Sequence, residues 1–327
     1  MVSLRAVHTH NASLKSLGAD LVAVFVGGTS GISLSTALSL ARHTASPKIY
    51  LIGQSRSAAE SAVCSIRALN PSAEPIFLLS DISLLKNVDR VCEQITSRER
   101  YVNILFMTPG YLTLRGRDET SEGLDRKFAL HYYARMRFVN RLLPLLVSAA
   151  EKPFPHSAPG SGLGLKDTFN LKKCGHHASL MTNFYLEGMA QRHKATSFVH
   201  AYPSGVDTGI LRGLPGGQFA RGFLSVLLKP FMVPLGESGE RHLFAATSGR
   251  FPCAAEGIQQ EGTGGRPRDV APGSDGRPGS GCYWVNWDGE VFPEHASIRQ
   301  KRAEGAVERV VEHTEEVFRR VCEDSYP

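Results

Sequence analysis

The sequence is poor in cysteine, and its cysteines lie far from one another. Six are present in 327 residues, and no two form a Cys-x-x-Cys pair. Such pairs are typical of zinc ribbons and redox motifs, and dense cysteine patterns are typical of disulfide frameworks, so both classes are excluded. The local cluster Cys174, His176 and His177 does not predict a metal site either, because adjacent helical residues point about 100° apart. We expect no metal ion and a reducing, intracellular environment.

Long runs of one charge and long apolar runs are also missing. Lys and Arg number 37 against 31 Asp and Glu, and the net charge of +6 is spread along the chain, which excludes a dedicated nucleic-acid binder. The longest apolar stretch, 219–235, is interrupted by Arg221, Lys229 and two prolines, so no transmembrane segment of ~20 apolar residues is expected. Residues 1–20 lack the apolar core of a secretory signal. We therefore expect a cytoplasmic protein.

What the sequence does contain is an alternation of short apolar runs with longer stretches of helical periodicity, between about residues 20 and 210. This alternation is typical of an α/β protein with a doubly wound parallel sheet. The predicted strands are 21–26, 48–52, 75–79, 102–107, 197–202 and 282–286. The predicted helices are 32–43, 57–69, 84–96, 124–148, 173–193 and 294–322. Residues 151–170 have almost no β-branched residue, so the fifth strand of the sheet is uncertain or missing.

The pattern predicts one domain with appendages. We expect an N-terminal extension at 1–20, a single α/β domain at 21–293, and a C-terminal helix at 294–327. Within the domain, about 209–240 would form a lid whose apolar content suits an apolar substrate, although plain core packing explains it equally well. A Gly- and Pro-rich solvated loop is predicted at about 254–281.

The strongest motif is Val26-Gly27-Gly28-Thr29-Ser30-Gly31-Ile32-Ser33, between a predicted strand and a predicted helix. Glycines there let the backbone turn tightly and approach a pyrophosphate, which the free N–H groups of the helix stabilise. The candidate cofactor-binding residues of this turn are Gly27, Thr29, Ser30, Gly31 and Ile32. A purely structural glycine turn is the alternative.

Gly27, Gly31 and Ser33 resemble the Gly-x-x-x-Gly-x-Gly turn of the short-chain dehydrogenase/reductase (SDR) family, with the last glycine replaced. Ser33 would either crowd the dinucleotide or bond a phosphate oxygen. Asp81, after the third predicted strand, resembles the Asp that contacts adenine, and Gly110 resembles the glycine of the family's Asn-Asn-Ala-Gly. Further segments resemble a branch of the family found in fungal secondary-metabolite gene clusters: 116–146, 198–203 and 240–245. The resemblance implies a Rossmann-like fold and oxidoreductase activity.

The cofactor type is predicted at the end of the second strand, where the chain reads Ile52-Gly53-Gln54-Ser55-Arg56-Ser57. NAD enzymes place an acidic side chain there to bind the ribose diol, and none is present. The Arg56 guanidinium can bind the 2′-phosphate of NADP with a fork of donors, so NADP is preferred. The alternative is that Arg56 is an ordinary exposed residue at a helix start.

The resemblance leaves the catalytic groups incomplete. The family uses Tyr-x-x-x-Lys, and no tyrosine here has a lysine four residues on; the matching frame reads Phe169 and Lys173. Lys173 is implied to hold the nicotinamide ribose, and His131 stands where the family has an Asn that holds a proton-relay water. Thr208 is implied to touch the phosphates or the carboxamide, unless its loop is only a turn. The candidate catalytic residues are therefore Lys173 and His131.

These observations predict an NADPH-dependent reductase or dehydrogenase acting on a carbonyl or alcohol of a small apolar metabolite, such as a polyketide. Three alternatives stay open. The chain could be a non-catalytic dinucleotide-binding protein, it could use another acid (His176, His177 or Tyr185), or its gene could lack a coding segment at about 151–169. The resemblance also implies a possible homo-oligomer, paired through helices near 124–146 and 173–193.

Overall fold

The structure, a computed structural model, describes residues 1–18, 20–110, 116–150, 160–164, 171–206, 208, 232–255 and 270–323. For 160–164 and 171–176 it describes the backbone path only. The helical elements that precede the sheet's last strands are α1 (Leu4–Ser13), η1 (Leu14–Leu17), α2 (Gly31–His43), α3 (Arg56–Leu69), α4 (Leu85–Thr96), α5 (Arg126–Phe128), η2 (Ala129–Tyr133), α6 (Ala134–Ala150) and α7 (Leu171–Arg192). Those that follow are α9 (Leu235–Thr247), α11 (Ala296–Ala303), α12 (Ala306–Phe318) and η5 (Arg319–Glu323).

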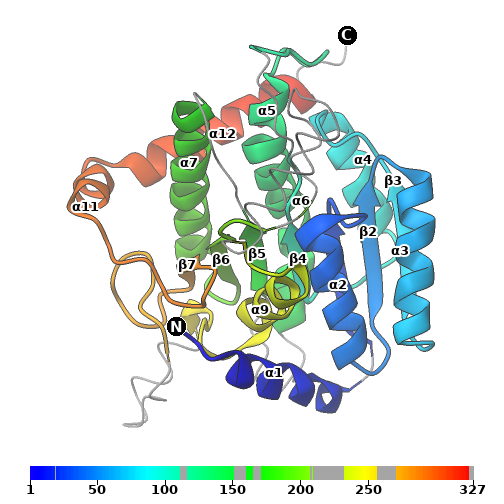
Figure 1. Ribbon diagram of the computed structural model, residues 1–327. Helices are drawn as coiled ribbons and strands as arrows, with labels where there is room; N and C mark the ends of the chain where they lie inside the picture. Colours follow the sequence, from blue (N-terminus) through cyan, green and yellow to red (C-terminus); the bar gives the residue numbers. More distant parts are fainter. Residues whose placement is uncertain are drawn as a thin grey trace, which may run out of the picture.

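The core of the protein is a parallel sheet of seven strands in the order β3-β2-β1-β4-β5-β6-β7 (Figure 1). The strands are β1 (Val22–Val26), β2 (Lys48–Gly53), β3 (Glu74–Leu79), β4 (Ile104–Met107), β5 (Gly160–Gly164), β6 (Ser197–Tyr202) and β7 (Cys282–Asn286). The chain runs outward from β1 to β3 and then returns to β4 on the other side of β1. In such a sheet the strand order reverses next to β1, and a crevice opens there at the carboxyl ends of the strands.

Helices cover both faces, which confirms the predicted doubly wound α/β fold. Alternate residues of each strand point to opposite faces, so β1 sends Ala23 and Phe25 into one core and Val22, Val24 and Val26 into the other. The first core contains residues of α2, α3 and α9, and the second contains residues of α4, α6, α7 and α12. Burial on both faces explains why β1 and β4 read as unbroken apolar runs.

The uncertain fifth strand is present, as β5. Its sequence is Gly-Ser-Gly-Leu-Gly, which has no strand propensity, and its place in the sheet comes from its neighbours. β5 pairs with β4 on one side, Ile104 opposite Gly160, and with β6 on the other, Gly160 opposite Ser197. Two flanking strands offer unpaired backbone groups on both sides, and pairing with them satisfies the N–H and C=O groups of this segment.

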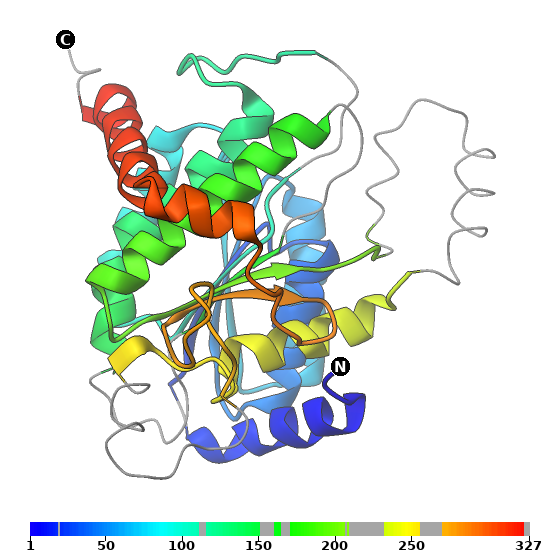
Figure 2. The same cartoon turned by 90° about the vertical axis from the view of Figure 1, so that its left-hand side faces the viewer.

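The C-terminal segment differs from the single helix predicted at 294–322. Gly305 adopts a left-handed conformation, with φ +75°, and divides the segment into α11 and α12. A glycine tolerates this conformation without steric cost, so the helix stops and restarts there. Figure 2 shows α11 and α12 crossing over α7, with which α12 is in contact. The predicted helix at 124–148 is also interrupted, by the π-helical turn η2 between α5 and α6.

The N-terminal residues pack on the body of the protein. Helix α1 contacts α9, and its buried Asn11 donates from Nδ2 to Oε2 of Glu240 over 2.7 Å. Burial alone would raise the pKa of Glu240, but Asn11, the charge of His43 and the Ser39 hydroxyl hold the pKa below its ordinary value. The carboxylate of Glu240 therefore joins α1, α2 and α9.

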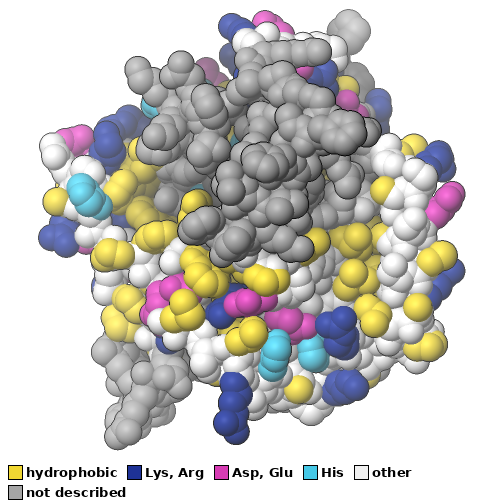
Figure 3. Space-filling model, viewed as in Figure 1, with side chains coloured by type: hydrophobic (Ala, Val, Ile, Leu, Met, Phe, Trp, Pro, Cys, Tyr) yellow, Lys and Arg dark blue, Asp and Glu magenta, His cyan; other side chains and the backbone are white. Residues whose placement is uncertain are grey.

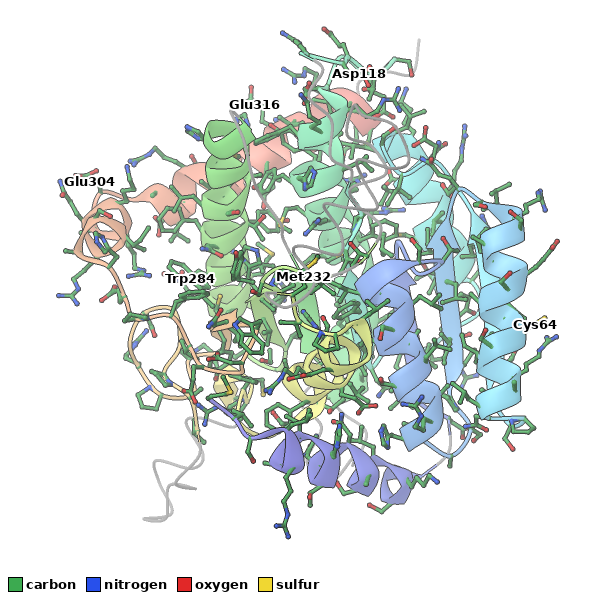
Figure 4. All side chains as sticks on the ribbon, in the orientation of Figure 1. Cys64, Asp118, Met232, Trp284, Glu304 and Glu316 are labelled. Atoms are coloured by element: carbon green, nitrogen blue, oxygen red, sulfur yellow. The ribbon has the colours of Figure 1, made fainter. Side chains whose placement is uncertain are left out.

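Among the side chains that are described on the face drawn in Figure 3, acidic, basic and apolar groups are interspersed. The described cysteines, Cys64, Cys92, Cys253, Cys282 and Cys322, are all free, and Cys64 lies on the outer side of α3 (Figure 4). In the described part of the chain, no helix is both long and apolar enough to cross a membrane.

Candidate active site

A cleft of about 660 Å³ opens at the carboxyl ends of β1, β2, β3 and β4, at the place where the strand order reverses. Its lining includes the predicted residues Gly27, Thr29, Ser30, Gly31, Ile32, Asp81, Gly110, His131 and Thr208. These residues are separated by up to 181 positions in sequence, and the parallel sheet brings them to one edge. Arg56 and Lys173 are predicted site residues whose side chains are not among the described lining.

The turn after β1 is shaped by two glycines with positive φ, Gly27 at +74° and Gly31 at +59°. Its backbone is fixed to β2, because Gly27 N donates to the Ile52 carbonyl over 2.9 Å. A methyl group added at Gly27 would lie 3.3 Å from the backbone nitrogen of Pro109. The missing side chain thus lets the first turn and the loop after β4 approach closely, and both form walls of the cleft.

Helix α2 begins at this turn with its N-terminal N–H groups uncapped. Ser30 is the N-cap residue, and its side chain makes no capping hydrogen bond. The first N–H groups of a helix have no partner within the helix, so this end of α2 can stabilise an anion. The glycine cradle and the uncapped helix start therefore fit the pyrophosphate of a dinucleotide.

Ser33, which replaces the last glycine of the turn, lies outside the cleft lining. Its side chain is buried, and its Oγ faces the Val26 carbonyl at 3.4 Å. Both earlier expectations for Ser33, crowding the dinucleotide or bonding a phosphate, required it to face the cleft. The structure turns it into the protein instead.

Asp81 lies in the cleft lining, in a polar cluster that joins three elements. Gln54, after β2, donates from Nε2 to Asp81 Oδ1 over 2.7 Å, and the backbone N–H of Ser83 donates to the same oxygen over 3.0 Å. Arg126, the first residue of α5, approaches Asp81 Oδ2 to 3.6 Å and donates to Ser83 Oγ over 2.8 Å. Arg126 lines the cleft and was not predicted from the sequence.

Arg56 is the first residue of α3 and is exposed to solvent. The residues before it, Gln54 and Ser55, line the cleft, and Ser55 caps α3 by accepting from Ala58 N over 3.2 Å. The described geometry therefore puts the backbone of Arg56 beside the cleft with its side chain in solvent. An exposed arginine at this position is compatible with both interpretations given above.

His131 and Gly110 meet in the cleft lining. A methyl group added at Gly110 would lie only 2.7 Å from Cε1 of His131, so the imidazole packs directly on the glycine backbone. His131 lies in the π-helical turn η2, and Gly110 follows β4. The described lining also includes Leu130, Arg135, Pro203, Val206 and Thr208.

Arg135 is a buried cation in the cleft lining, and the sequence did not single it out. It is 2 % exposed, and it donates to two backbone carbonyls: from Nη2 to Pro109 over 2.5 Å and from Nε to Leu130 over 3.3 Å. Burial and the charge of Arg135 lower the pKa of His200, on β6, to about 3. The available signal was an arginine on the apolar side of a predicted helix, which is uncommon unless the charge is paired.

The predicted Tyr-x-x-x-Lys frame is only partly described. The backbone of Lys173 lies in the first turn of α7, and its side chain, like Phe169, lies outside the described residues. Of the alternative acids, the side chain of His176 is likewise not described, and His177 is exposed. Tyr185 is fully buried, burial raises its pKa, and it is not part of the described cleft lining. Tyr185 is therefore poorly placed to act as an acid there.

The search of protein-family models found no match. Individual proteins do match along the chain. Oxidoreductase AN1596 of Emericella nidulans is 41% identical over 97% of this chain and 98% of its own length. A short-chain dehydrogenase/reductase of Stachybotrys chartarum, SAT2, is 24% identical over 96% of both chains.

Solved structures show the same fold. A short chain dehydrogenase from Shigella flexneri, solved in complex with NADP, superposes with a TM-score of 0.55 over 72% of this chain and 94% of that one, at 14% identity. Fold, cleft and relatives together show that the chain belongs to the short-chain dehydrogenase/reductase family. Within that family it is similar to fungal oxidoreductases, as the sequence motifs predicted.

Proposed function

We propose that the protein is an NADPH-dependent oxidoreductase that acts on a carbonyl or alcohol of a small apolar metabolite, in the cytoplasm and in secondary metabolism. The observation that carries this proposal is the cleft itself. It combines a glycine turn, an uncapped helix start and a second strand that is followed by Gln54 and Ser55, with no acidic side chain at that point. The fungal oxidoreductase relatives and the NADP complex of a structural neighbour support it.

The chain's own residues would hold the cofactor along the cleft. The backbone N–H groups of Gly31 and Ile32 would bind the pyrophosphate, and Asp81 would contact the adenine ring. The Arg56 guanidinium would bind the 2′-phosphate from the start of α3. Lys173 would hold the nicotinamide ribose, and Thr208 would touch the carboxamide or the phosphates.

NADPH, when bound, supplies a hydride to the carbonyl carbon of the substrate. The carbonyl oxygen gains negative charge as the hydride arrives and must then take up a proton. His131 lies at the cleft surface and can donate that proton or hold a water that does. Arg135 also lines the cleft, where it is buried and bonded to the carbonyls of Pro109 and Leu130.

The cofactor proposal is tested by nucleotide binding. Arg56→Gln should weaken NADPH binding by about tenfold and leave NADH binding nearly unchanged, because only NADPH carries the 2′-phosphate. Titrations that follow the intrinsic fluorescence of NADPH and of NADH give the two dissociation constants. Arg67→Gln, an exposed arginine on the same helix, is the matched control. Equal losses for both nucleotides, or no loss, would contradict the role of Arg56.

Activity is tested by NADPH oxidation with a panel of ketones and aldehydes. Binding without turnover would favour the alternative of a non-catalytic dinucleotide-binding protein, which the Phe169 frame supports. Phe169→Tyr should raise turnover if only the acid is missing. Transcript sequencing across 150–170 tests the missing coding segment; the match to AN1596 over 97% of this chain and 98% of that one weighs against a large one.

A further inference from the structure

The π-helical turn η2 has an unusual backbone that needs external support. In a π turn the hydrogen bonds run from residue i to i+5, and here the Ala134 N–H donates to the Ala129 carbonyl. The wider turn displaces neighbouring carbonyls from the regular ladder of an α-helix. The side chain of Arg135, one turn further along, donates from Nε to the Leu130 carbonyl over 3.3 Å.

The same guanidinium reaches a second segment. Its Nη2 donates to the carbonyl of Pro109, in the loop after β4, over 2.5 Å. One planar, charged group thus bonds two backbone oxygens that belong to different elements. With 2 % of its surface exposed, Arg135 makes these bonds in a setting where water does not compete.

The two bonded carbonyls flank the contact between His131 and Gly110. Leu130 directly precedes His131, and Pro109 directly precedes Gly110. The imidazole of His131 packs so closely on Gly110 that an added methyl group would lie 2.7 Å from Cε1. Any change in the distance between the two backbone segments therefore changes this contact, and with it the width of the cleft there.

We propose that Arg135 is a positioning residue whose guanidinium clamps the loop after β4 to the η2 turn and so fixes His131 against Gly110. The nucleotide-binding consequence of the clamp rests on the proposed function, whereas the contact itself does not. Arg135 acts through the backbone carbonyls of Leu130 and Pro109.

The clamp predicts how strongly each of four variants binds NADPH. Arg135→Ala and Arg135→Met remove it, and both should weaken NADPH binding by about tenfold or more. Arg135→Lys keeps the charge but should recover little of the affinity, because an ammonium lacks the fork that bonds two oxygens at once. Arg141→Met, on the same helix but bonded to Asp89 and Glu93 at the surface, should bind NADPH like the wild type.

Chemical rescue separates positioning from general stability. Methylguanidinium ion should restore at least half of the lost affinity to Arg135→Ala, which leaves a space for it, and none to Arg135→Met, which fills that space. In the NMR spectrum, the Cε1–H signal of His131, assigned with His131→Gln, should move in the Ala, Met and Lys variants and return in Arg135→Ala with methylguanidinium. Circular dichroism checks that each variant is folded.

The outcomes distinguish the two proposals. If the wild type does not bind NADPH, the proposed function fails, and the His131 signal still tests the clamp. If the wild type binds but Arg135→Ala and Arg135→Lys behave like Arg141→Met, with the His131 signal unmoved, the clamp is wrong. If Arg135→Ala and Arg135→Met do not fold, Arg135→Lys decides: a shifted His131 signal supports the clamp and an unshifted one contradicts it.

Discussion

At the scale of single residues, the cleft depends on places where a side chain is missing. Gly27 and Gly31 bring the first turn close to the loop after β4 and to Thr208, respectively, and Gly110 lets the His131 ring lie on the backbone. A glycine at such a position contributes space, so its replacement acts on its neighbours. The effect of a methyl group at each position therefore measures how closely the walls of the cleft approach.

Gly110→Ala should weaken NADPH binding by about tenfold, because the new methyl group and the His131 ring cannot both keep their places. The dissociation constant from a fluorescence titration measures the effect. Gly249→Ala is the control, since a methyl group there would meet no atom within 4 Å. Unchanged affinity in Gly110→Ala would show that the contact does not shape the nucleotide site.

His200 makes the stability of the protein depend on pH. Burial and the charge of Arg135 lower its pKa from 6.5 to about 3 in the native state. Between these values the unfolded chain binds a proton that the native state does not, so the free energy of unfolding is largest above pH 6.5 and decreases as the pH falls. Between about pH 7 and about pH 5, the free energy of unfolding of the wild type should fall by about 2 kcal/mol more than that of His200→Gln.

Urea unfolding at the two pH values measures this difference. Gln keeps a hydrogen-bonding side chain opposite Asn183, the partner of His200, but does not titrate. Other buried histidines, such as His242, contribute equally to both proteins and cancel in the comparison. Equal losses in wild type and variant would mean that His200 is protonated in the native state at pH 5.

Residues of the site differ in how far the sequence predicts them. Gly27, Gly31 and Asp81 follow strands within recognisable motifs, so their place at one edge of the sheet could be predicted from their spacing and order. Arg126 and Arg135 could not, because each makes a tertiary contact with a residue distant in sequence, Asp81 for Arg126 and the Pro109 carbonyl for Arg135. Ser33 was placed correctly in the turn, but its rotamer, which turns Oγ to Val26, depends on local packing.

At the scale of elements, the end of the chain supports the turn that carries His131. Tyr132 and Tyr133 of η2 are hydrogen-bonded to α12: Tyr132 Oη lies 2.6 Å from Thr314 Oγ1, and Tyr133 Oη lies 2.9 Å from Nε2 of His313. Burial raises the pKa of Tyr132 well above its ordinary value, so its hydroxyl stays neutral. Helix α12 thus holds η2 through two tyrosines that are not part of the described cleft lining.

Thr314→Val should lower the free energy of unfolding by about 1–3 kcal/mol, because the buried Tyr132 hydroxyl loses its partner while the side chain keeps its volume. Thr314→Ser retains the hydroxyl and should recover most of the loss. Glu312→Gln, exposed on the same helix, should change stability by no more than about 0.5 kcal/mol. Chemical unfolding measures all three; equal values for Val and Ser would refute the role of the hydrogen bond.

Elements with strong local signals were predicted with their bounds, and those set by tertiary contacts were not. β6 and β7 agree with the prediction at both ends, since apolar residues and turn residues delimit them. β5 has neither signal, and only its pairing with β4 and β6 makes it a strand. The π turn η2 was also not predicted from the sequence, because a one-residue expansion of the helix leaves its apolar periodicity nearly unchanged.

At the scale of the whole molecule, one buried charge network joins segments from three regions of the sequence. Glu187 on α7 is bonded to Arg302 on α11, and Ser274 donates from Oγ to Glu187 over 3.0 Å. Arg302 also bonds Glu294 and the Ser274 carbonyl. The Glu187 side chain is 5% exposed and that of Arg302 20%, so neither charge is well solvated without the other.

Glu187→Gln should therefore lower the free energy of unfolding by about 1.5–3 kcal/mol, since it removes the more buried of the two carboxylates that pair with Arg302 and leaves Glu294 as the other. The surface pair Arg192 and Glu315, 51% and 44% exposed, provides the comparison: Arg192→Gln should cost less than about 1 kcal/mol. Urea unfolding of both variants gives the difference. A cost for Glu187→Gln no larger than that of the surface pair would show that the network contributes little.

Helix α12 has a further consequence for how the molecule assembles. The helices through which pairing with a second copy was expected, α6 and α7, already contact this segment: α12 lies against α7, and Arg137 of α6 stacks on the ring of Phe318 at 5.0 Å. Helix α12 and Phe318 thus occupy part of the surface of α6 and α7 where pairing with a second copy was expected. Contacts within one chain do not depend on the protein concentration. We therefore expect the unfolding midpoint to stay constant across a hundredfold dilution, which would lower the free energy of unfolding of a dimer by ~2.7 kcal/mol. An unfolding midpoint that rises with protein concentration would show that two copies of the chain associate in spite of these contacts of α12.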